Sequence, residues 1–171
     1  GLIGVSNVKN QLGLSFTYNI ITHSYAKNIS ILGAGQLGGL AGVFRGTIEK
    51  SYAFTDIETL SDSAGGLVGY LDNSLEHSVP TKILNAYSLG NINDLSNYPL
   101  PHGIGGLIGE ISADISNGNV IIINNSYSGV LLVPSSLSGG LIGKIIGDGI
   151  LNVSVVNSYW DTQISGRETS A

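Results

Sequence analysis

The chain has 171 residues, of which 42% are hydrophobic and only 11% are charged, and its formal net charge is −5. It contains no cysteine, which excludes disulfides, cysteine-based zinc sites and thiol nucleophiles. Because phosphate contacts need grouped Lys and Arg, the acidic balance argues against a nucleic-acid partner. No apolar stretch approaches the roughly 20 residues that span a bilayer, so we expect no membrane insertion.

The residue composition indicates strands rather than helices. Glycine occurs 25 times, and β-branched residues, Asn and Ser fill much of the sequence between the glycines. A helical domain draws more heavily on Ala, Glu, Lys, Arg and Gln. The composition therefore predicts an all-β fold whose stability comes from strand stacking.

A five-residue phrase, Gly-Gly-Leu-apolar-Gly, repeats along the chain. The complete copies are residues 38–42, 65–69, 105–109 and 139–143, and a shortened copy is residues 1–4. A second phrase, a small residue followed by Tyr, comes downstream of each copy: Ser24-Tyr25, Ser51-Tyr52, Ala86-Tyr87, Ser126-Tyr127 and Ser158-Tyr159. Two phrases that recur in one order indicate a fixed structural unit with loops of variable length.

The spacing of the phrases predicts a parallel β-solenoid, or β-helix. Successive complete copies begin 27 to 40 residues apart, the range in which each repeat stacks on its neighbours without a core of its own. We expect a single repeat domain over residues 1–171 with about five irregular units, near residues 1–37, 38–64, 65–104, 105–138 and 139–171. Inserts at residues 94–102 and 133–138 have the turn residues of loops.

Each unit is expected to contain two strands, and the Gly-Gly-Leu phrase begins the first. Leu107 and Ile111 share one parity in an extended chain and Glu110 has the other, so the apolar pair should face the core. The equivalent pairs are Leu40 with Phe44, Leu67 with Leu71, and Leu141 with Ile145. The residue after each Leu is apolar with outward parity: Ala41, Val68, Ile108 and Ile142. Either the glycines bend the strand and reset its parity, or a second layer covers that face.

The second strand is expected to end in the tyrosine phrase. Four residues before each Tyr is an apolar core position, occupied by Ile21, Ile48, Ile83, Ile123 and Val155. Two residues before each Tyr is a polar position, occupied by His23, Lys50, Asn85, Asn125 and Asn157. Asn tolerates left-handed backbone and can hydrogen-bond along a stack, so this column predicts a turn. The small residue suits a tight inward corner, and the Tyr ring should cover the coil edge.

The glycines of the phrase have a structural explanation. Stacked coils lie about 4.8 Å apart, so a side chain at a sharp corner would strike the next coil, whereas glycine avoids this and permits positive φ. The alternative is a phosphate-binding loop, which residues 138–144 resemble superficially. That alternative fails on spacing, and the other copies have Val43, Tyr70 or Glu110 in place of Lys144.

Together, the two phrases resemble the GLUG repeat of bacterial surface proteins, over nearly the whole chain. Residues 157–166, Asn-Ser-Tyr-Trp-Asp-Thr-Gln-Ile-Ser-Gly, are similar to the closing phrase of such arrays. The resemblance implies an elongated stalk or adhesive segment of a large exported protein, as in filamentous-haemagglutinin-like adhesins and some immunoglobulin A1 peptidases. It implies a secreted or cell-surface location and supplies no catalytic residues. Because the first residues fall inside a repeat phrase, we expect the chain to be a fragment of a larger protein.

The titratable residues form no recognisable catalytic motif, and we expect no catalytic residues and no cofactor. The histidines, His23, His77 and His102, occur in unrelated contexts, and no nucleophile elbow is present. A carbohydrate-active β-helix enzyme would need paired carboxylates. The acids are scattered: Glu49, Asp56, Glu58, Asp62, Asp72, Glu76, Asp94, Glu110, Asp114, Asp148, Asp161 and Glu168.

Two further features have a functional and a structural interpretation. Asp72, Asp114 and Asp148 each follow a Gly-Gly-Leu phrase and could align as a calcium-binding row, although solvated turn residues are the favoured interpretation and we predict no metal site. Trp160 takes a position held by Ala or Ser in the other units. It could bind a sugar ring, but we expect it to cap the last coil, because terminal repeats must cover the end of the stack.

The sequence thus predicts a non-enzymatic stalk or adhesive segment of an exported bacterial surface protein. Its expected partners are neighbouring domains of the same polypeptide and a host surface protein, matrix protein or glycan, and its binding residues are not identified. A self-assembling extracellular fibre and a carbohydrate-active enzyme are the alternatives.

Overall fold

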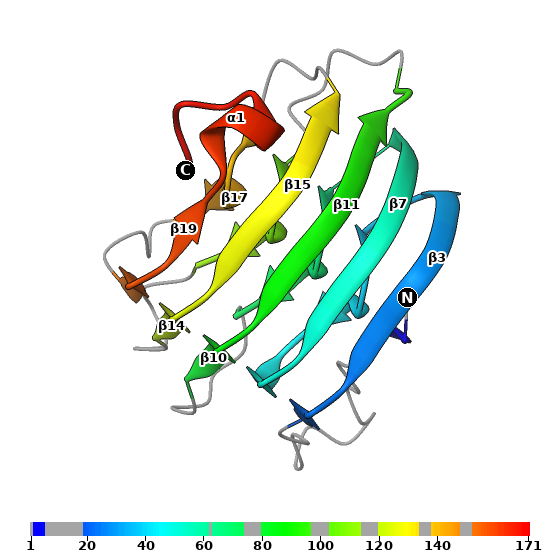
Figure 1. Ribbon diagram of the computed structural model, residues 1–171. Coiled ribbons are helices and arrows are strands. Elements are labelled where there is room, and N and C mark those ends of the chain that lie inside the picture. Colours follow the sequence, from blue (N-terminus) through cyan, green and yellow to red (C-terminus); the bar gives the residue numbers. More distant parts are fainter. Residues whose placement is uncertain are drawn as a thin grey trace.

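The chain folds as a parallel β-solenoid in which four sheets run along the stack (Figure 1). The computed structural model describes residues 2–5, 19–61, 63–73, 80–96, 103–113, 120–133, 138–147 and 152–171. Every strand pair is parallel, and a short C-terminal helix lies at one end of the stack. The predicted all-β solenoid is therefore confirmed.

Each complete coil contributes one strand to each sheet. Sheet A contains β1 (Ile3–Val5), β5 (Ala41–Phe44), β9 (Val68–Asp72), β13 (Ile108–Ser112) and β17 (Ile142–Ile146). Sheet B contains β2 (Asn19–Thr22), β6 (Gly46–Glu49), β10 (Thr81–Leu84), β14 (Ile121–Asn124) and β18 (Val153–Val156). Sheet C contains β3 (Tyr25–Ala34), β7 (Tyr52–Ser61), β11 (Tyr87–Asp94), β15 (Tyr127–Val133) and β19 (Tyr159–Trp160). Sheet D contains β4 (Leu37–Gly38), β8 (Ala64–Gly65), β12 (Ile104–Gly105) and β16 (Ser138–Gly139), and α1 is Thr162–Ser165.

The two sequence phrases stack in register from coil to coil. Tyr52 pairs with Tyr25 and with Tyr87, and Gly65 pairs with Gly38 and with Gly105. The expectation of two strands per unit was wrong, because the coil has four. The Tyr phrase does not end a strand; instead, each Tyr begins a strand of sheet C, and the Gly-Gly-Leu phrase spans the corner from sheet D to sheet A. Most of the loop inserts, residues 97–102 and 134–137, lie outside the described residues.

The corner between sheets B and C is made by a left-handed residue, as the sequence predicts. All five residues two positions before Tyr have positive φ: His23 at 49°, Lys50 at 48°, Asn85 at 50°, Asn125 at 51° and Asn157 at 47°. The Asn125 side-chain amide donates a hydrogen bond to the Asn85 amide oxygen at 3.3 Å, which forms the expected link along the stack. This backbone conformation turns the chain, which explains why sheet B strands stop before the tyrosine.

The small residue before each Tyr points into the coil and closes the same corner. Ser51, Ala86 and Ser126 are buried, as predicted. The Ser126 hydroxyl donates to the Asn124 carbonyl oxygen at 3.0 Å, and the Ser126 backbone N–H donates to the Ser158 hydroxyl oxygen at 3.1 Å. The serine hydroxyl in this column therefore donates to a backbone carbonyl of its own coil and accepts from a backbone N–H of the preceding coil.

The corner between sheets D and A buries both apolar residues of the Gly-Gly-Leu phrase. Leu67, Val68 and Leu71 all have no exposed surface, and the same holds for their equivalents in the third complete copy. The chain bends at Gly66 and Leu67 before β9 begins, so simple strand parity does not apply there. Sheet D also covers the glycine face of sheet A, since a Cβ on Gly69 would lie 2.7 Å from the Leu37 backbone nitrogen. Gly69 and Val68 have opposite parities, so this contact does not account for the burial of Val68. Val68 packs in the same core cluster as Leu67 and Leu71, which supports the bend as the explanation.

The phrase glycines allow backbone to approach backbone, as the sequence predicts. A Cβ on Gly66 would strike the Gly106 carbonyl oxygen of the next coil and would lie 2.8 Å from the Ser88 Cβ across the coil. The expected positive φ was wrong for these positions, because the positive-φ glycines of the described residues are Gly35, Gly46, Gly90, Gly147 and Gly166. The glycines of the phrase are needed for space rather than for an unusual backbone conformation.

The interior contains two apolar clusters. The larger one lies among sheets A and B and the start of sheet C, and contains Phe44, Ile48, Leu71, Ile83 and Ile111. The smaller one joins the second half of sheet C to sheet D, and contains Ile57, Ile92, Ile104 and Val130. The predicted core pairs are confirmed, except that Ile145 in the last coil is only partly buried.

Trp160 and the residues after it cap the C-terminal end, as predicted. The Trp160 ring packs against the larger core cluster and over Gly140, and its indole N–H donates to the Arg167 carbonyl oxygen at 2.9 Å. The C-terminal tail then takes the place that a further coil would occupy in the backbone hydrogen bonding, because the Gly140 N–H donates to the Thr169 carbonyl oxygen at 2.9 Å. The cap does not extend to sheet B, where the core residue Val155 is 43% exposed.

The close approach at Gly66 predicts a severe effect of Gly66→Ala. The added methyl group would meet the Gly106 carbonyl oxygen, the Ser88 Cβ and a methyl group of the buried Val130. None of these is the end of a long flexible side chain, so we expect a loss of about 3 kcal/mol in the free energy of unfolding. Urea denaturation followed by circular dichroism measures this change. Gly33→Ala is the matched control, because its Cβ would lie 3.4 Å from the flexible Leu37 side chain. Equal effects of the two variants would contradict the close-approach argument.

The left-handed conformation of Lys50 predicts that Lys50→Asn stabilises the protein. Asn adopts positive φ more readily than Lys, so we expect a gain of about 0.5–1 kcal/mol in the free energy of unfolding, measured by thermal and urea denaturation. The lost ion pair with Glu49, 3.5 Å long and exposed, should cost little. Lys82→Asn in the middle of β10 should instead be neutral or destabilising.

Candidate functional site

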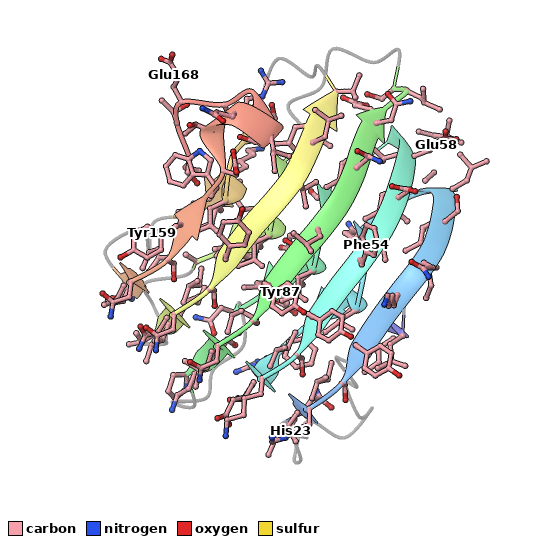
Figure 2. The ribbon with its side chains drawn as sticks, in the orientation of Figure 1. His23, Phe54, Glu58, Tyr87, Tyr159 and Glu168 are labelled. Atoms are coloured by element: carbon pink, nitrogen blue, oxygen red, sulfur yellow. The ribbon has the colours of Figure 1, made fainter. Side chains whose placement is uncertain are left out.

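The outer face of sheet C carries exposed side chains in a regular arrangement. Along β7 the side chains alternate, so that Ala53, Thr55 and Ile57 are buried while Phe54, Asp56 and Glu58 are exposed. The same alternation holds on β11, and the pairing register places equivalent residues of successive coils in columns. Figure 2 shows Tyr87 and Phe54 on this face and Glu58 toward the far end of its strand.

Stacked tyrosines form the first column of this face. The Tyr25 and Tyr52 rings have centroids 5.3 Å apart and lie within 8° of parallel, and the Tyr52 and Tyr87 rings are 4.8 Å apart and within 2°. These distances match the spacing of the coils, because identical residues in register must stack at the strand separation. The rings lie on the outer face of sheet C rather than over the coil edge, which corrects the sequence expectation.

A groove of about 510 Å³ runs between the next two columns of the same face. Its lining residues are Ser30, Asp56, Ile57, Glu58, Asn91, Asn93, Leu131 and Val133. Asp56 pairs with Asn91, and Asn91 with Leu131, so one wall follows the stack across three coils. Glu58 and Asn93 begin the other wall, which continues to Val133. The inward-facing Ile57 lies between the two walls.

The polar groups of the groove are already ordered by a hydrogen bond. The Asn91 side-chain amide donates to an Asp56 carboxylate oxygen at 2.7 Å. This bond uses one N–H of the amide and one oxygen of the carboxylate, and leaves each group further hydrogen-bonding capacity. The groove therefore offers fixed donors and acceptors on an exposed surface.

A second polar group lies on the outer face of sheet A. The Ser63 hydroxyl donates to a Glu110 carboxylate oxygen at 3.0 Å, and Tyr70 is the residue aligned with Glu110 in the preceding coil. Burial raises the pKa of Tyr70, the nearby charges of Asp72 and Glu110 raise it further, and a hydrogen bond with Ser112 opposes the rise. Lys144, which had suggested a phosphate-binding loop, lies on strand β17 and is aligned with Glu110 of β13. A phosphate-binding loop would instead precede a helix.

The column that contains Asp72 is not an acidic row. Asp72 pairs in register with Ser112, and the equivalent residue of the last coil is Ile146. Asp114 and Asp148 lie outside the described residues. Asp72 is buried at the corner where Arg45 is also buried, and its charge counteracts the lowering of the Arg45 pKa that burial causes. Asp72 thus has a structural explanation as the counter-charge of a buried Arg.

The other candidate residues are dispersed. His23 lies at the B–C corner, where its ring Nδ1 is 2.8 Å from the Thr22 hydroxyl oxygen (Figure 2), and His77 and His102 lie outside the described residues. Asp161 accepts from the backbone N–H groups of Gln163 and Ile164 and caps α1. The described part of the chain has no group of three or more His, Cys, Asp or Glu side chains placed to hold a metal ion.

Two observations concern the chain as a whole. Within the described residues, no helix has the length and apolar character needed to cross a membrane. Comparison with protein-family models, curated proteins and solved structures gave no significant match. The function of this chain is therefore inferred from the surfaces of its fold.

The sequence interpretation missed the groove residues Ser30, Asn91, Asn93, Leu131 and Val133. It followed each unit only as far as the tyrosine phrase, where the strand was expected to end. The missed signal is the alternation after each Tyr, as in Phe54, Asp56 and Glu58, which has the period of a half-buried strand.

The raised pKa of Tyr70 predicts a contribution to alkaline unfolding. A group that binds its proton more tightly in the folded state adds stability below its unfolded pKa of about 10, and this stability is lost as pH rises through the folded pKa. We therefore expect Tyr70→Phe to reduce the loss of stability above about pH 10. Thermal denaturation from neutral to alkaline pH measures the effect. An unchanged alkaline profile would mean that Tyr70 does not contribute.

Proposed function

We propose that this chain is a non-enzymatic stalk or adhesive segment of an exported bacterial surface protein, with the outer face of sheet C as its adhesive surface. The observation that carries the proposal is the in-register stack itself, which presents one exposed aromatic and polar face across successive coils. A solenoid of this kind provides length and a repeated surface from a few residue types. The resemblance of its two phrases to GLUG repeats supports the same assignment.

The two alternative functions fit the fold less well. Head-to-tail fibre assembly needs an open C-terminal edge, but Trp160 and the tail already cover part of the last coil and leave sheet B residues such as Val155 exposed. A carbohydrate-active enzyme needs an enclosed pair of carboxylates, whereas Asp56 and Glu58 are exposed on an open strand face. A rigid binding segment requires neither feature.

The proposal predicts that the segment is displayed outside the cell. Antibodies raised against the 171-residue chain should label intact cells of the bacterium that encodes it, and protease added outside should remove the signal. Deleting the segment in frame should weaken attachment of the cells to their substratum, while an antibody to another part of the parent protein still labels them. Labelling that requires lysed cells would contradict the proposal, as would hydrolytic activity of the purified chain on polysaccharides.

A further inference from the structure

We propose that the groove on the outer face of sheet C binds a neutral, linear glycan that lies along the solenoid axis. This inference rests on the adhesive function proposed above and names the ligand class of that surface. The groove is long in the direction of the stack, because its walls are columns of aligned residues from successive coils. An extended polymer fits this shape better than a compact ligand does.

The composition of the groove matches a polymer that carries hydroxyl groups on an apolar ring skeleton. Asp56, Asn91 and Asn93 provide carboxylate and amide groups that accept from and donate to hydroxyls, and bonds to a carboxylate are the stronger kind. In the next coil, Leu131 and Val133 make the groove apolar, and their exposed side chains can pack against C–H groups of a sugar ring. The groove thus has a polar stretch over the coils of Asp56 and Asn91, followed by an apolar stretch in the coil of Leu131.

An apolar row beside the groove extends the contact surface. Phe54 precedes Asp56 by two residues, faces the same way and is 41% exposed. It is aligned with Leu89 in the next coil. The tyrosine column adds less, because the faces of Tyr52 are covered by Tyr25 and Tyr87 and only ring edges and hydroxyls are accessible. A bound sugar ring would therefore pack on Phe54 rather than between tyrosines.

The charge of the groove selects among polymers. Asp56 and Glu58 are acidic, and the residues that line the groove include no Lys or Arg. Both carboxylates are exposed to water, so their repulsion of an anionic polysaccharide and their attraction of a cationic ligand are equally weak. An anionic polysaccharide gains nothing from this small term, and a cationic ligand would compete with Asn91, whose amide already donates to Asp56. A neutral polymer does not depend on charge attraction, and its hydroxyl groups can donate hydrogen bonds to both carboxylates.

An extended peptide is a poorer occupant because of where the groove lies. Peptides that bind sheets add as a strand and pair with an exposed edge. The groove is on the face of sheet C, and β7 and β11 each pair with a strand on both sides. Their backbone groups are used within the sheet, so a peptide would find side-chain partners only.

The test uses the full 171-residue chain, isotopically labelled, in nuclear magnetic resonance titrations with soluble oligosaccharides. The neutral probes are cellohexaose, xylohexaose and mannohexaose, the cationic probe is a chitosan hexamer, and the anionic probe is hexagalacturonate. We expect saturable shifts from at least one neutral probe, centred on Asp56, Asn91 and Asn93. The amide signals around Tyr70 and Glu110 on sheet A should stay in place.

Three variants separate hydrogen bonding from charge. Asp56→Ala should weaken binding of the neutral probe about 10-fold or more, because a charge-assisted acceptor is lost. Asp56→Asn keeps an acceptor without the charge, so it should weaken binding less than Asp56→Ala does. Glu49→Ala on sheet B has the same charge change as Asp56→Ala and should leave binding unchanged. Circular dichroism and thermal denaturation of each variant show whether it is folded.

Several results would overturn the inference. These are a folded chain that binds none of the neutral probes, binding restricted to the chitosan hexamer, shifts centred on sheet A, and equal weakening by Asp56→Ala and Glu49→Ala. None of these results bears on whether the segment is displayed on the cell surface, so failure of the glycan site and failure of the proposed function are distinguishable.

Discussion

The parallel backbone ladder between successive coils determines most of the other features of this protein. Neighbouring parallel strands lie about 4.8 Å apart, so equivalent residues of successive coils are held at that distance. Side chains that tolerate a copy of themselves at this spacing can recur, and others cannot. Tyrosines stack, Asn125 donates a hydrogen bond to Asn85, and isoleucines align in the core. Glycine remains where backbone atoms of the next coil leave no room for a Cβ, as at Gly66.

The same ladder explains how a chain with few charges and no cross-links is held together. Each coil is too small to enclose a core, and its apolar residues become buried only when coils lie above and below it. Ile48, Ile83 and Ile123 are fully buried in internal coils, whereas the aligned Val155 of the last coil is largely exposed. The protein limits this end effect with Trp160 and its tail, which supply an indole ring and backbone hydrogen bonds where the next coil would have supplied them.

The outer face of sheet C shows how a solenoid produces a surface suited to binding. Its strands are the longest in the coil, so they carry side chains beyond the region that the other sheets need for the core. Alternation sends every second residue outward, and register places these residues in columns. The groove between Asp56 and Glu58 is therefore a consequence of strand geometry, and its chemistry is free to vary because these positions make no contribution to the core. Such a face can change ligand without a change of fold.

The sequence alone determined the repeat, the parallel solenoid, the core column of Ile48, the left-handed corner at Asn85 and the capping role of Trp160. These features follow from one coil's residue types and from the requirement that equal residues stack. Only the tertiary structure decided that a coil has four strands, that Val68 packs in the core cluster with Leu71, and that Asp72 lies near Arg45 in a column with uncharged residues. Each of these depends on where a corner falls, and a shift of one or two residues at a corner changes which side chains meet. The groove depends on that register as well, since Asp56 and Asn91 are far apart in sequence and meet only because their coils align.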